Sequence, residues 1–200
     1  MLQVRGPKAQ QFVDLLSAYS GWTLVLVNAT VTFSTSGLIN PFESQTLQDL
    51  VGEILRSPNV VEVVASGSKP NPAAGFFFDA FFANPMLPGP RGSVYVDDIL
   101  KVQNLSPVLA RVLMGHVLRE YFLASYPPGQ APGRAFFQFH VSAIQTEAQI
   151  ASDLMGRPVW TGNRRAWEGM SGTINVRSYG PNMRFQLYFT AGDLRAVKGP

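Results

Sequence analysis

The hydrophobic and polar positions along the chain predict helices and strands in mixed order. Apolar residues at helical spacing indicate helices over 7–18, 44–56, 105–125 and 134–155. Alternating apolar residues indicate strands over 22–33, 60–65 and 93–99, and a hairpin formed by 173–178 and 183–189 within 171–189. These elements predict an α+β fold, in which a mixed sheet packs on two long helices and a C-terminal β-hairpin closes the domain.

Residues with cap and turn preferences mark the ends of these elements. Ser44 and Ser106 stand at N-cap positions, Pro107 suits a first helical turn, and Gly21 ends the first helix. Asn28-Ala29 interrupts the first β-rich segment and predicts a turn or bulge there. The long stretch 67–92 is rich in Pro, Gly and Phe, and we interpret it as an ordered loop with a short helix.

Aromatic residues of this loop have two interpretations. They pack in the core or form a lid, which is the common role of such residues. Alternatively, they line a cleft for a peptide or partner protein together with a residue of the next strand. The residues concerned are Phe76, Phe77, Phe78, Phe81 and Tyr95.

Composition narrows the class of protein. A chain of 200 residues that is 46% hydrophobic suits a single domain, 1–200, with a sizeable core. The net charge of +3 is scattered along the sequence without a basic stripe, so no nucleic-acid partner is expected. The absence of cysteine excludes disulfides and thiol chemistry.

The N-terminal residues lack the apolar core of a signal peptide, and no apolar run reaches the ~18–20 residues of a membrane span. We therefore expect a soluble protein, with any export through a dedicated secretion or injection system. No G-x-S-x-G elbow, phosphate-cradling loop or dinucleotide fingerprint is present, so nucleotide, flavin and haem are not expected as cofactors.

The candidate chemistry centres on His116 and Glu120. They stand four residues apart on a predicted helix and therefore share a face. The other histidine, His140, and Glu147 stand on the next predicted helix. Such a pair is often a surface contact, and a histidine such as His140 is often a core residue. The adjacent Asp97 and Asp98 are not expected to act together, because neighbouring strand residues face opposite sides.

The arrangement resembles zincin-like (gluzincin-type) metallopeptidase toxin domains of bacterial polymorphic and RHS-type effectors. The resemblance is carried by GSVYVD at 92–97, GHVLRE at 115–120 and HVSAIQTEAQ at 140–149, followed by LMGRP at 154–158. It covers about residues 15–165 and implies a zincin-like fold. It also implies a zinc site formed by His116, Glu120 and His140, with Glu147 orienting a ligand or serving as a base.

Three departures from the family pattern distinguish the functional hypotheses from one another. Glu120 stands where the family has a histidine, and His140 stands where it has a glutamate. Val117 replaces the glutamate that acts as general base in H-E-x-x-H. We expect an effector or toxin-type domain whose peptidase activity is impaired or lost and which binds a peptide or protein, such as an immunity protein or the delivery apparatus. The alternatives are an active zinc peptidase and a non-catalytic structural or cargo protein of a secretion or contractile injection system.

Overall fold

The computed structural model of the chain describes residues 1–38, 44–67, 92–126, 136–156 and 158, and three strands within 173–199. Five strands form a sheet in the order β2-β3-β1-β4-β5. They are β1 (Leu2–Arg5), β2 (Trp22–Val27), β3 (Thr30–Leu38), β4 (Val61–Ser66) and β5 (Ser93–Tyr95). The sheet is mixed, because β1 pairs with β3 antiparallel and with β4 parallel, and β4 pairs with β5 parallel.

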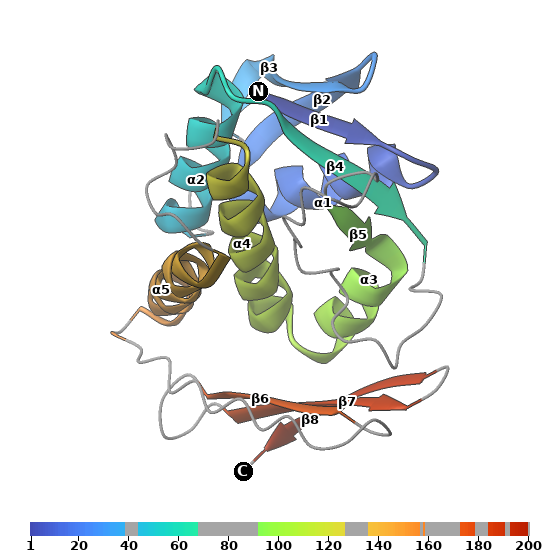
Figure 1. The fold of residues 1–200 in the computed structure, drawn as a ribbon, viewed down its shortest axis with the longest axis vertical. Helices are drawn as coiled ribbons and strands as arrows, with labels where there is room; N and C mark the ends of the chain where they lie inside the picture. The colour runs from blue at the N-terminus through green and yellow to red at the C-terminus, as the bar shows by residue number, and fades with distance from the viewer. Residues whose placement is uncertain are drawn as a thin grey trace.

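Within the described residues, five helices accompany this sheet (Figure 1). They are α1 (Ala9–Ser20), α2 (Gln45–Arg56), α3 (Val96–Leu105), α4 (Pro107–Ala124) and α5 (Phe136–Met155). A second, three-stranded antiparallel sheet has the order β6-β7-β8 and consists of β6 (Thr173–Ser178), β7 (Arg184–Thr190) and β8 (Asp193–Gly199). The α+β fold class expected from the sequence is therefore confirmed.

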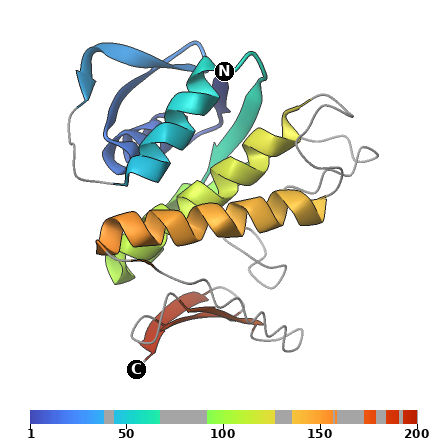
Figure 2. The ribbon, with the colours of Figure 1, turned by 90° about the vertical axis from the view of Figure 1, so that its left-hand side faces the viewer.

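The core lies between one face of the five-stranded sheet and the helices. Strands β1 and β4 alternate, so that Leu2, Val4, Val61 and Val63 are buried on the face turned to the helices. Apolar residues of α1, α2 and α4 pack against them in one continuous cluster. In Figures 1 and 2, α5 lies beside α4, away from the sheet. The long helix α4 therefore stands between the sheet and α5.

Several predicted boundaries agree with the structure. Gly21 ends α1 in the left-handed conformation at φ 74°. The side chains of Ser44 and Ser106 accept hydrogen bonds from the amides of Leu47 and Leu109 at the starts of α2 and α4. The Asn28-Ala29 turn joins β2 to β3 with positive φ angles at both residues.

The predicted strand over 93–99 is wrong beyond Tyr95. From Val96 onward the chain is helix α3, with Tyr95 at its N-cap. The alternation of Val94 and Val96 suggested a strand, but Ile99 and Val102 continue at helical spacing and are buried. Acidic residues in the first turn also favour a helix start.

Two strands were not predicted at all. Strand β1 has only four residues, and β8 turns the predicted hairpin into a three-stranded meander. The predicted loop over 67–92 lies almost wholly outside the described residues, as do the side chains of Phe76, Phe77, Phe78 and Phe81. The prediction made for them therefore stays a prediction.

Hydrogen bonds between residues far apart in the sequence connect α5 to the start of α2. The carboxylate of Asp153 accepts hydrogen bonds from the amide of Thr46 at 2.8 Å and the hydroxyl of Ser44 at 2.7 Å. Burial alone raises the pKa of Asp153, but these hydrogen bonds outweigh it and lower the pKa below the ordinary value of 3.8. The carboxylate thus acts as a second cap for α2.

Replacing Asp153 should make stability less dependent on acid pH. Since its pKa is lower in the folded state than in the unfolded state, its contribution is present above the unfolded pKa and is lost as the pH falls through the folded pKa. We expect Asp153→Asn to lower the free energy of unfolding by about 0.5–2 kcal/mol at pH 7, as for a lost helix cap. The deficit should shrink in urea titrations at successively lower pH.

Asp14→Asn is the matched control, because Asp14 is exposed and its carboxylate accepts a hydrogen bond from Gln10 of its own helix, α1. It should change stability by no more than about 0.5 kcal/mol. A deficit for Asp153→Asn that stays constant down to the acid limb would contradict the cap assignment.

Candidate functional site

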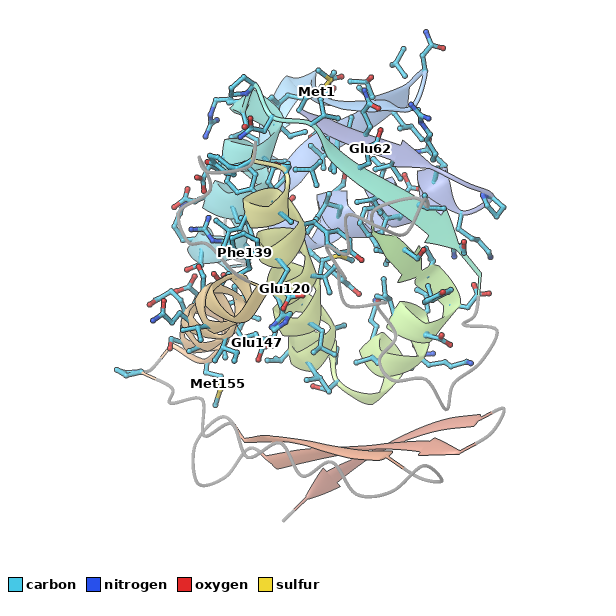
Figure 3. The ribbon with its side chains drawn as sticks, in the orientation of Figure 1. Met1, Glu62, Glu120, Phe139, Glu147 and Met155 are labelled. Carbon is cyan, nitrogen blue, oxygen red and sulfur yellow. The ribbon has the colours of Figure 1, made fainter. Side chains whose placement is uncertain are left out.

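His116 lies between two carboxylates in the interface of α4 and α5. Its Nε2 is 2.9 Å from Oε1 of Glu120, one turn later on α4, and its Nδ1 is 2.5 Å from Oε1 of Glu147 on α5. Figure 3 shows Glu120 and Glu147 turned toward each other between the two helices. The structure therefore brings together three of the four residues singled out in the sequence.

This cluster is buried. His116 is 6% exposed, Glu120 3% and Glu147 0%. The interpretation of His116 and Glu120 as a surface pair is therefore wrong, because α5 and the core cover the face of α4 that they share. A buried carboxylate is stable only when it is paired, so the contacts with His116 matter energetically.

The geometry favours the imidazolium form of His116. Only the protonated ring has two N–H donors, and each ring nitrogen faces a carboxylate oxygen. Burial by itself lowers the pKa of His116, but the charges and hydrogen bonds of Glu147 and Glu120 more than offset this and raise the pKa above 6.5. The same contacts hold the ring in one orientation.

A metal ion would use only part of this set. Nε2 of His116 and Oε1 of Glu120 are adjacent donors, and a carboxylate on the other ring nitrogen is how proteins commonly orient a metal-bound histidine. Within the described residues, however, no group of three or more His, Asp or Glu side chains is arranged to hold a metal. A complete site needs another ligand, and the side chain of the predicted one, His140, lies outside the described residues.

The structure also describes three other residues considered in the sequence analysis, and none of them lies in the His116 cluster. Tyr95 is buried at the end of β5. Asp97 pairs with Lys8 and Asp98 with Lys101, each at 3.1 Å, so these carboxylates have separate partners. They do so from the first turn of α3 and not from a strand.

Gly115 is a residue that the sequence reasoning missed. A Cβ built at Gly115 would collide with Cδ1 of Ile150, and it would lie 3.6 Å from Cδ1 of Leu47. Glycine therefore allows α5 to approach α4 directly beside His116. The sequence did contain an indication of this role, because a single glycine inside a long apolar helix often marks a close approach of another element.

Val117 lies in the hydrophobic core and is 5% exposed. Its side chain belongs to the apolar cluster and not to the polar cluster of His116, Glu120 and Glu147. The face of α4 that carries position 117 thus packs in the hydrophobic core.

Comparison of the chain with protein-family models, with curated proteins and with solved structures gave no match. Among the described residues, no helix has the length and apolar character needed to cross a membrane.

Gly115→Ala should show coupling with Ile150→Val. The added methyl group raises helix propensity by about 1 kcal/mol but overpacks the interface by about 1–3 kcal/mol. Ile150→Val removes the colliding Cδ1 and alone costs about 0.5–1.5 kcal/mol. We expect a double-mutant cycle, measured by urea unfolding, to show coupling. The free energy of unfolding of the double variant should exceed the value expected from adding the two single effects by about 1–2 kcal/mol. Additive energies would contradict the close approach at Gly115.

Val117→Glu should destabilise the fold without creating a catalytic base. The new carboxylate would be buried among apolar side chains, at a cost of about 3–5 kcal/mol for an uncompensated charge. Val117→Gln has the same shape without the charge and is the control. Because burial raises the pKa of the new carboxyl group, the deficit relative to Val117→Gln should shrink as the pH falls toward ~4. Equal stabilities at neutral pH would show that position 117 is accessible to water.

Proposed function

We propose that the chain is a zincin-related effector or toxin-type domain with an altered metal site and impaired or lost peptidase activity. The metal ligands proposed are His116, Glu120 and His140, with Glu147 as the carboxylate that orients His116. The observation that carries the proposal is the contact of Glu147 with Nδ1 of His116, beside the contact of Glu120 with Nε2. The effector role itself rests on the sequence resemblance.

The types and order of the residues support this proposal. His116 and Glu120 supply nitrogen and oxygen donors one turn apart, as zinc sites on helices require. His140 stands seven residues before Glu147 on α5, which is about two helical turns. When bound, zinc would supply Lewis-acid polarisation and a water of lowered pKa.

The chain's own residues determine how much catalysis is left. Glu147 fixes the imidazole ring of His116, and Glu120 accepts the Nε2 proton that any metal would displace. Val117 provides no proton acceptor. Absence of general-base assistance typically costs ~10²–10⁴-fold in rate, which supports impaired over full activity. Activity with Glu147 as base would require this carboxylate to leave its contact with His116.

A second candidate role is a metal-free polar lock between α4 and α5. The observation that favours it is that both nitrogens of His116 already have carboxylate partners. In that case the cluster holds two helices together and function resides in binding a peptide or protein partner elsewhere on the domain.

Metal analysis separates these two roles. After incubation with excess zinc and desalting, the wild-type protein should retain about one zinc per chain, as a single site would. His116→Asn and Glu120→Gln should abolish retention, and Glu147→Gln should weaken affinity by roughly 10–100-fold. Asp153→Asn is the control. It removes a negative charge from α5, the helix of Glu147, but lies outside the cluster, so it should leave the zinc content unchanged.

A wild-type protein that remains metal-free would contradict the metal site. If His116→Asn then lowers the melting temperature more than Asp153→Asn does, the cluster is a structural lock. Circular dichroism of every variant checks that loss of metal does not reflect loss of fold.

A further inference from the structure

The three C-terminal strands carry the charge imbalance of the chain. They contain four basic residues and one acidic residue, which equals the whole net charge of +3. The rest of the chain is neutral, with twelve residues of each sign. The charged residues of the strands are Arg177, Arg184, Asp193, Arg195 and Lys198. Segregated positive charge of this kind favours polyanionic partners.

Strand pairing places basic residues at register positions next to aromatic residues. Arg177 pairs with Phe185, and Phe185 pairs with Lys198, so one row across the sheet reads cation, aromatic, cation. Directly paired residues share a face of the sheet. On the other face, Tyr188 of the middle strand pairs with Arg195. Each face therefore carries an aromatic residue of β7 with a cation at the neighbouring register position.

This grouping is hidden in the linear sequence. Arg177, Phe185 and Lys198 are eight and thirteen residues apart, so they form no basic stripe. The register of the three strands, which Figure 1 draws as a meander, places these residues in one row. With neighbouring strands about 4.8 Å apart, the two cationic positions stand roughly 10 Å apart with the aromatic position between them.

We propose that the β6-β7-β8 sheet binds single-stranded nucleic acid. Aromatic residues of a β-sheet can stack with unpaired bases, and neighbouring Arg and Lys residues can neutralise the phosphates. A duplex keeps the faces of its bases stacked, and an acidic protein would need the cations but not the aromatic row. The site is separate from the His116 cluster, and it departs from the expectation of no nucleic-acid partner.

Fluorescence anisotropy of the full 200-residue protein with a labelled oligouridylate of about 12 nucleotides tests this assignment. Affinity should fall with rising salt, by about 0.7 logarithmic units per phosphate contact for each tenfold change in salt. Arg177→Gln with Lys198→Gln should reduce that slope by roughly 1.4. Phe185→Leu should weaken binding about tenfold at unchanged slope, because it removes stacking and no charge.

Arg5→Gln with Arg56→Gln is the matched control. Both arginines are exposed on the body of the domain, and the change in net charge is the same. This pair should leave affinity within about twofold, as expected for cations that make no phosphate contact. An equal loss in the control would assign the binding to overall charge and overturn the proposal.

Three other results would also overturn it. They are no binding at low salt, stronger binding of duplex than of single strand, and displacement by polyglutamate as effective as by unlabelled oligouridylate. The last would assign the sheet to an acidic protein partner. If the variants unfold, ultraviolet cross-linking of the unsubstituted protein to oligouridylate tests the site instead. The proposal requires the cross-linked peptide to contain Phe185 or Tyr188. Cross-links confined to other segments would reject the site.

Discussion

The pairing of His116 with two carboxylates is the constraint on which the arrangement of α4 and α5 depends. Both helices bury an acidic residue, Glu120 and Glu147, and each needs His116 as partner. Sliding α5 by one turn would bring Ala143 or Ala151 to the place of Glu147 and leave a buried charge without this partner. The cluster thus fixes the register of the two helices. Gly115 contributes by letting the helices approach at the same level.

Local chemistry explains which parts of the fold were predictable. Caps at Ser44 and Ser106, the left-handed Gly21 and the Asn28-Ala29 turn act through neighbouring residues, so their signals survive in the sequence. Segments shaped by distant contacts were harder. Residues 93–99 carry both strand and helix periodicity, and the sheet accommodates only the first three. Strand β1 is too short to signal itself, and it exists because β3 and β4 flank it.

The candidate site also has features that the local sequence predicts and features that it does not. That His116 and Glu120 share a face follows from helix geometry alone. Their burial and the contact with Glu147 depend on how α5 crosses α4, which no local pattern encodes. The ligand role of His140 is still a prediction from resemblance. The cationic and aromatic row of the second sheet is the clearest case, because it arises only from strand register.

The central place of β1 in the first sheet bears on how the chain folds. Leu2 pairs with Val61, so one edge of β1 gains its neighbour only after about sixty residues have been added. Closing a loop of that length is slow compared with forming the local β2-β3 hairpin or the helices. During synthesis, one edge of β1 therefore stays unpaired until β4 has been made. That interval is when contacts with other chains compete most strongly with correct folding.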